Sequence, residues 1–246
     1  MGMERLIMEI LNEILDNDDD VKTFYLYLES LYKDREFFNL RHINDMIDLV
    51  DFILKKLNDG GIIDDYFITS CDIVMKSFLM AVLFHHAHSY VYINCNTAST
   101  KICEKIIKFF GLEKDIDIGG VSFYINATLT SKTYLNEKEF DLSNGDEKKV
   151  MLYKVLHDAE IIETFNSAFS LYLIKVGRIC KDTMKSLNID KSEFISRRIC
   201  DLIEMNERED LFLLDIHNNN SSLVNTVRTN IERELQMYDL GFEIVF

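Results

Sequence analysis

The sequence predicts an all-α protein, and three observations support this fold class. Apolar residues recur at three- and four-residue spacing through most of the chain, which is the period of a helix with one buried face. Strand-like alternation is scarce, and GFEIVF at 241–246 is either a strand or an apolar tail. Hydrophobic residues make up 48% of the 246 residues, so there is enough apolar side chain to fill a substantial core.

Helical periodicity predicts six helices in the first half of the chain, at about 3–16, 21–32, 39–57, 97–110 and 120–130, with another from about 65 to the histidines at 85–88. The chain contains no proline. Its helices must therefore end at glycine, asparagine, aspartate or serine. Gly60 and Gly61 are expected to end the third helix, and Gly111 is expected to end the helix at 97–110.

The second half is expected to add helices at 147–157, 160–188, 191–206 and 222–238, with the polar loop at 217–222 capping the last one. No internal repeat of solenoid length is present. We therefore expect one helical domain over residues 1–246. It would have an N-terminal layer at 1–34, a core at 35–162 and C-terminal helices at 163–246 packed on that core.

Charge and hydropathy exclude several classes of partner. The formal net charge is −15, whereas a protein that binds duplex nucleic acid normally carries a basic face. No apolar stretch approaches the roughly 18–20 residues of a membrane-spanning helix, and the acidic, amphipathic start does not resemble a leader peptide. The five cysteines show no CxxC or zinc-ribbon spacing. We expect a soluble, cytoplasmic protein that binds neither nucleic acid nor membrane.

The stretch LMAVLFHHAHSY at 79–90 places three histidines at the end of a very apolar helix. Imidazoles are costly to bury without polar partners. Two interpretations remain open for His85 and His86: a metal ion satisfies them, or they are ordinary hydrogen-bonded core residues. His88 is read as a surface histidine.

Two further polar residues lie in similar apolar, helical surroundings. His42 lies beside the apolar face of the helix at 39–57, and Asp158 lies in the apolar segment VLHDAEII. Mixed imidazole and carboxylate ligands from different helices suit a divalent transition metal such as Mn, Fe, Co, Ni or Zn. His157 would point about 100° away from Asp158 on a helix, and His217 lies in a polar loop where we expect it to be solvated.

In the order and spacing of these motifs, the chain resembles the HD-domain superfamily of metal-dependent phosphohydrolases. The resemblance covers residues 35–162, about half of the chain. The matching segments are Arg35-Glu36-Phe37-Phe38-Asn39-Leu40-Arg41-His42-Ile43, Phe84-His85-His86, Asn96-Thr97, Ala127-Thr128-Leu129-Thr130-Ser131 and Asp158-Ala159-Glu160-Ile161. It implies an HD-domain-like helical bundle.

The resemblance also implies the roles of individual residues. A metal would be held by His42, His85, His86 and Asp158, with His86 standing where the family has the aspartate of its His-Asp doublet. Asp158 would belong to the catalytic group. Arg35, or alternatively Lys132, would neutralise charge on the phosphoryl oxygens.

Several positions depart from the family pattern, and they separate two functional hypotheses. The changed positions are Phe38, His86, Thr97, Thr130 and Ser131. We expect a degenerate HD-domain protein with weak or no hydrolase activity, which retains a divalent metal and acts through contacts with a protein partner. The alternative is an active metal-dependent phosphohydrolase acting on a nucleotide-like or small phosphoester. Some other all-α function is the third possibility, and no oligomeric state follows from the sequence.

Overall fold

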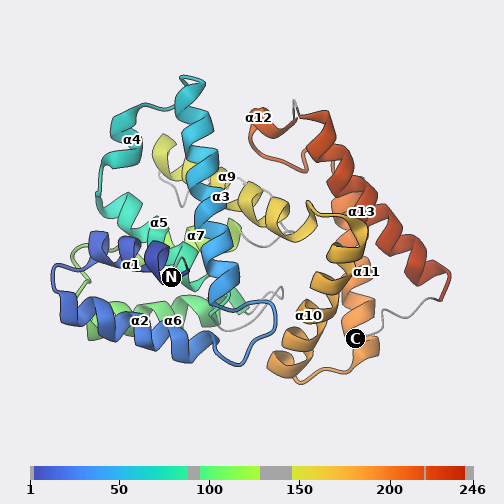
Figure 1. The fold of residues 1–246 in the computed structure, drawn as a ribbon, viewed down its shortest axis with the longest axis horizontal. Coiled ribbons are helices and arrows are strands. Elements are labelled where there is room, and N and C mark those ends of the chain that lie inside the picture. Colours follow the sequence, from blue (N-terminus) through green and yellow to red (C-terminus); the bar gives the residue numbers. More distant parts are fainter. Residues whose placement is uncertain (1–2, 88–94, 128–145, 219, 242–246) are drawn as a thin grey trace.

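A computed structural model describes residues 3–87, 95–127, 146–218 and 220–241, and helix is the only regular secondary structure in these ranges (Figure 1). The predicted all-α fold class is confirmed. The expected strand or tail at the C-terminus lies outside the described residues. The helices are α1 (Met3–Ile14), α2 (Asp18–Tyr32), α3 (Leu40–Asp59), α4 (Asp65–Thr69), α5 (Ile73–Phe84), α6 (Cys95–Phe109), α7 (Ile118–Ala127), α9 (Glu147–Phe165), α10 (Phe169–Leu187), α11 (Lys191–Glu207), α12 (Asp215–Asn218) and α13 (Ser221–Asp239).

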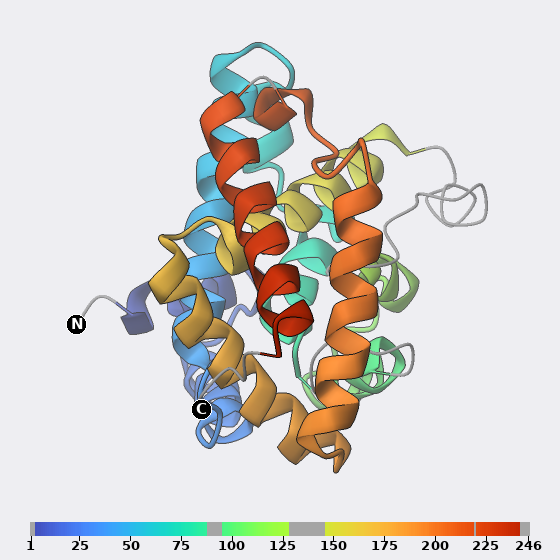
Figure 2. The ribbon, with the colours of Figure 1, turned by 90° about the vertical axis from the view of Figure 1, so that its right-hand side faces the viewer.

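The helices from α1 to α7 gather on one side of the molecule, and α10 to α13 gather on the other (Figure 1). The first group encloses the main apolar core together with the first half of α9. In the second group α11 packs against both α10 and α13, and these helices face the viewer in Figure 2. A separate apolar cluster fills the space between them and α9.

Helix α9 lies between the two groups and contacts α3, α5, α7, α10 and α13. It is buried on nearly all sides, since most residues from Leu152 to Phe165 are shielded from solvent. Most polar side chains from Leu152 to Phe165 are therefore shielded from water. Each of them must therefore find a partner inside the protein.

The structure corrects two predicted helix boundaries. The helix expected from residue 65 to the histidines is broken at 70–72, where the Asp72 carboxylate caps α5 by accepting a hydrogen bond from the Met75 backbone N–H (2.9 Å). The expected break before residue 160 does not occur. Helix α9 continues to Phe165, and the turn to α10 lies at 166–168. Asp158 and Glu160 therefore lie on one continuous helix.

Other expectations about helix ends agree with the structure. Gly61 follows α3 with a φ of 68°, and Gly111 has the same φ after α6. Residues with a side chain avoid this left-handed conformation, so glycine suits both positions. Asn220 caps α13 by accepting the Leu223 N–H, as the loop at 217–222 predicted. No helix in the described part of the chain has the length and apolar character needed to cross a bilayer.

Candidate metal centre

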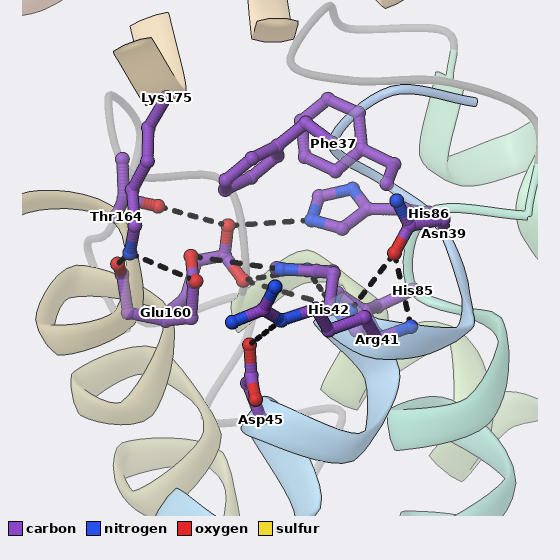
Figure 3. A network of polar contacts seen from close by, with 12 residues as sticks. Phe37, Asn39, Arg41, His42, Asp45, His85, His86, Glu160, Thr164 and Lys175 are labelled. Carbon is purple, nitrogen blue, oxygen red and sulfur yellow. Dashed lines mark hydrogen bonds and ion pairs between the residues drawn. The ribbon is translucent and has the colours of Figure 1, made fainter. Parts of the chain in front are cut away.

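His42 is positioned by the start of α3. The Asn39 side chain caps this helix and accepts hydrogen bonds from the backbone N–H groups of Arg41 (2.9 Å) and His42 (3.3 Å). The cap fixes the first turn of α3, because it satisfies N–H groups that have no partner within the helix. The His42 ring is buried and faces α5 and α9 (Figure 3).

His85 and His86 follow directly after α5, and Arg35 holds this turn. The Arg35 guanidinium donates hydrogen bonds to the backbone carbonyls of His86 and Ala87 (2.6 Å to Ala87). Nearby, the Tyr32 hydroxyl donates to the Leu83 carbonyl at 2.7 Å. The last carbonyls of a helix lack partners within it, so these two side chains complete the end of α5.

Three imidazoles and one carboxylate converge at the junction of α3, α5 and α9 (Figure 3). Nε2 of His42 lies 3.1 Å from Nε2 of His85, and Nε2 of His86 lies 3.2 Å from Oε1 of Glu160. Oε2 of Glu160 lies 3.6 Å from Nε2 of His85. Each residue offers one ligand atom, these atoms all lie within 4.8 Å of one another, and all four residues are buried.

The hydrogen bonds of His85 determine which of its ring nitrogens faces the centre without a proton. Nδ1 of His85 lies 2.7 Å from the Val82 carbonyl oxygen. A carbonyl only accepts, so Nδ1 carries the proton and donates. Burial, reinforced by the neighbouring His86, lowers the pKa of His85 well below its usual value and keeps the ring neutral. Nε2 of His85 therefore presents a lone pair to Nε2 of His42.

Glu160 brings a buried carboxylate to the same point. Burial raises the pKa of Glu160, and the neighbouring His42 acts in the opposite direction. The Thr164 hydroxyl donates to Oε1 at 3.5 Å, whereas Oε2 has no hydrogen-bond partner among the described residues. A buried carboxylate facing imidazole lone pairs needs a cation. Either a proton on His42 or a metal ion can supply that charge.

Four of the distances between donor atoms suit one metal ion, and the whole set lies within 4.8 Å. Nitrogen and oxygen ligands lie about 2.0–2.2 Å from a transition metal, so two of them around one ion are about 3.0–4.4 Å apart. The pairs of Glu160 Oε2 with His42 and with His85 measure 3.9 and 3.6 Å, and the two closest pairs fall in the same range. Three nitrogens and one oxygen favour Zn, Ni, Co, Fe or Mn over Ca or Mg.

Two phenyl rings cover the histidines. The Phe38 ring centroid lies 4.2 Å from that of His86, and the Phe37 centroid lies 5.0 Å from that of His42. The carboxylate of Asp182 on α10 accepts the backbone N–H groups of both residues (2.8 and 3.0 Å), as well as that of Glu36 (2.9 Å). Helix α10 thus fixes the loop that shields the cluster from one side.

A cavity of about 430 Å³ adjoins the cluster on the side of His42 and Glu163. Its wall includes three cationic side chains, Arg41, Lys175 and Arg178. Arg41 lies 3.8 Å from the Asp45 carboxylate, and Lys175 lies 2.9 Å from that of Glu163. The cavity therefore has both signs of charge, and it reaches the outer edge of the His42 ring.

The structure brings together three of the four predicted metal ligands and excludes the fourth. His42, His85 and His86 meet, but the Asp158 carboxylate accepts the backbone N–H groups of Leu213 (2.8 Å) and Leu214 (2.9 Å). The prediction that Asp158 completes the metal site is thus corrected. Residues two apart on a helix point about 200° away from each other, so Asp158 and Glu160 face opposite sides of α9.

Sequence reasoning missed Glu160, although a signal for it existed. Glu160, Glu163 and Thr164 are spaced three and four apart, which places them on one face of an otherwise apolar helix. The predicted helix break before residue 160 hid this polar stripe. Glu160 is the second acid of the segment Asp158-Ala159-Glu160-Ile161, whereas the sequence-based prediction assigned the first acid, Asp158, as the metal ligand.

The predicted catalytic role of Arg35 has no geometric support, because its guanidinium is bonded to the carbonyls after α5. The two other described histidines, His157 and His217, lie apart from the cluster. His157 is buried, and burial together with the charge of Arg208 lowers its pKa to about 3. His217 is buried rather than solvated, with Nε2 3.9 Å from the Asp158 carboxylate. His88, Thr130, Ser131 and Lys132 lie outside the described residues.

Comparisons with protein-family models, with curated proteins and with solved structures found no significant match to this chain. The resemblance to HD-domain proteins therefore depends only on the motifs of the sequence.

Proposed function

We propose that this protein binds one divalent transition metal ion through His42, His85, His86 and Glu160, and that it is a degenerate HD-domain protein with little or no hydrolase activity. The observation that supports metal binding most strongly is the convergence of Nε2 of His42 and His85, 3.1 Å apart, beside a buried carboxylate oxygen that lacks a hydrogen-bond partner in the described structure. Metal ligation would satisfy all these atoms at once.

The kinship with HD-domain proteins is supported by the order of the ligands along the chain. One histidine opens a helix, a His-His doublet ends another, and an acid from a later helix completes the set. The acid is Glu160 rather than Asp158, so the position of the distal carboxylate departs from the family pattern.

Weak or absent hydrolysis is supported by the way in which the four ligands are enclosed. Catalytic metal centres keep a coordination position open to water or substrate, whereas structural centres are filled by protein ligands. Here four protein donors are available, all are buried, and Phe38 packs against His86. His86 also replaces a carboxylate that could orient or deprotonate an attacking water.

The metal would then act by joining helices that are distant in sequence. It would tie α3, α5 and α9 together at the edge of the main core. A ligand that binds only the folded state stabilises it by mass action. Such a structural metal would hold the surface of the folded protein fixed without any catalytic turnover. This role fits a protein that works through contacts with a protein partner.

Elemental analysis of the purified chain tests the proposal without a known substrate. We expect about one equivalent of a transition metal in the wild-type protein and a large loss of it in His85→Ala. The matched control is His217→Gln, which changes a buried histidine outside the cluster. A folded wild-type protein that neither contains nor takes up Zn²⁺, Ni²⁺, Co²⁺ or Mn²⁺ would contradict the proposal, and a proton on His42 would then balance the charge.

The cavity beside His42 favours one alternative, an active metal-dependent phosphohydrolase. Arg41, Lys175 and Arg178 could bind the oxygens of a nucleotide-like or small phosphoester. A bound metal would supply Lewis-acid chemistry to such a substrate. Turnover of generic phosphoesters with added Mn²⁺ or Ni²⁺, lost in His85→Ala, would favour this alternative over the degenerate protein.

A further inference from the structure

The two ring nitrogens of His42 face different partners. Nε2 points to His85 and the rest of the cluster, whereas Nδ1 points to the Glu163 carboxylate, with 3.6 Å between Nδ1 and Oε2. This separation is that of an ion pair and is a few tenths of an ångström longer than a hydrogen bond. Both atoms are buried, and neither has a hydrogen-bond partner among the described residues. The pair is complementary, because an imidazole N–H donates and a carboxylate accepts.

Lys175 of α10 holds Glu163 in place. Its ammonium lies 2.9 Å from Oε1 of Glu163 and also donates to the backbone carbonyl of the same residue. Oε1 is thus occupied by Lys175, which leaves Oε2 directed at His42.

The arrangement matches a general feature of metal sites. A histidine that binds a metal through one ring nitrogen usually donates its other N–H to a carboxylate or a carbonyl, which fixes the tautomer and the ring orientation. His85 already does this through Val82. Glu163 is placed to do the same for His42, since a proton on Nδ1 leaves Nε2 as a free lone pair at the centre.

We propose that Glu163 and Lys175 are positioning residues of the metal centre, with Glu163 orienting His42 and Lys175 orienting Glu163. This inference rests on the proposed function. It extends the centre from α3, the end of α5 and α9 to α10, which reaches Glu163 through the Lys175 ammonium. Neither residue was marked as functional by the sequence.

The test measures metal affinity in the full-length chain by competition with a chromophoric chelator, and it records the visible spectrum of bound Co²⁺. We expect Glu163→Gln to weaken Co²⁺ and Zn²⁺ binding about 10–100-fold, the usual effect of removing such a partner. The Co²⁺ spectrum should also change, since a reoriented His42 alters the ligand field. We expect Lys175→Met to act in the same direction with a smaller effect, and Lys175→Arg to restore part of the affinity.

Asp45→Asn is the matched control. Asp45 is another carboxylate on the wall of the same cavity, and its variant removes the same charge without touching Nδ1 of His42. We expect its affinity to stay within about twofold of the wild type. Equal losses of metal affinity in Asp45→Asn and Glu163→Gln would mean that affinity depends on nearby negative charge and not on the orientation of His42. That result would overturn the positioning role.

The outcomes separate this inference from the proposed function. If wild type binds Co²⁺ and Glu163→Gln binds it equally well with the same spectrum, the positioning role is wrong and the metal site stands. If the wild type binds no metal, both fail. A thermal unfolding curve of each metal-free variant shows that the chain is folded. If Glu163→Gln does not fold, Lys175→Met with an unchanged affinity and spectrum overturns the inference.

Discussion

Two buried polar clusters flank the boundary between the two groups of helices, and they differ in how their hydrogen bonds are completed. In the C-terminal cluster, Arg198 of α11 contacts both carboxylate oxygens of Glu234 on α13 (3.1 Å each), and the Tyr172 and Tyr238 hydroxyls donate to the same carboxylate. In the proposed metal-site cluster of His42, His85, His86 and Glu160, the Glu160 carboxylate is equally buried, yet one of its oxygens lacks a hydrogen-bond partner in the described structure.

The difference separates a cluster whose hydrogen bonds are complete from one whose polar groups are only partly paired. The Arg198–Glu234 pair is neutral and hydrogen-bonded by its own residues, so it needs nothing from outside. The metal-site cluster has three imidazoles, a carboxylate and two close ring nitrogens. A proton on His42 or a bound metal ion can complete it. Burial of polar groups is thus common to both clusters, and completeness of pairing distinguishes them.

The largest expected effect is the loss of stability when the C-terminal cluster, whose hydrogen bonds are complete, is broken. Replacing Glu234 by alanine leaves the Arg198 charge buried without its carboxylate, and we expect a loss of about 3–5 kcal/mol in the free energy of unfolding. Urea denaturation measures this loss, which should be the same with and without added metal. An exposed pair gives the control: Asp51→Ala, which removes the partner of Lys55, should cost less than about 1 kcal/mol. A loss of less than about 1 kcal/mol for Glu234→Ala would show that this buried cluster contributes no more than an exposed ion pair.

The next largest effect is the stabilisation that added metal should give through the proposed metal-site cluster. Free Zn²⁺ or Co²⁺ at about 100 times its dissociation constant should stabilise the wild-type protein by about 2.7 kcal/mol, because it binds only the folded chain. Glu160→Gln and His85→Ala should lose this gain. Thermal unfolding with metal and with excess chelator measures it. An equal stabilisation of Glu160→Gln by metal would mean that the ion binds at another site.

A buried histidine outside both clusters, His157, contributes to the acid dependence of stability. The pKa of His157 is about 3 in the folded protein and 6.5 ordinarily, so the unfolded chain binds its proton first. Its contribution is complete above pH 6.5 and is lost as the pH falls toward 3, with about 2 kcal/mol gone at pH 5. His157→Leu should flatten this part of the stability curve. Urea denaturation of both proteins between pH 7 and 5 measures the slope of the free energy of unfolding against pH. The same slope in His157→Leu as in the wild type would contradict this prediction.

The smallest effect concerns the loop that covers the histidines. Asp182→Asn weakens the three backbone hydrogen bonds that hold residues 36–38, and we expect a loss of roughly 1–2 kcal/mol in stability. Release of bound metal to a chelator should also become faster, since Phe37 and Phe38 are held less firmly. Stopped-flow absorbance with Co²⁺ measures the release. Release at the wild-type rate would show that these rings do not restrict access.

Part of the site was predictable from sequence because its signals are local. His85 and His86 end a very apolar helix, and His42 sits beside an apolar face, so each is forced to find polar partners inside the fold. The fourth ligand was not predictable in this way. Asp158 and Glu160 lie in the same apolar segment, and the choice between them depends on the rotation of α9 about its axis.

The sequence by itself determined that the chain is helical, where most helices begin and end, and that three histidines must be accommodated near apolar surfaces. Only the tertiary structure decided that α9 continues past residue 158, that Leu213 and Leu214 take the Asp158 carboxylate, and that Lys175 of α10 reaches Glu163. The reason is physical: periodicity fixes which face of a helix is buried, whereas the partner of each buried polar group depends on how separate helices pack.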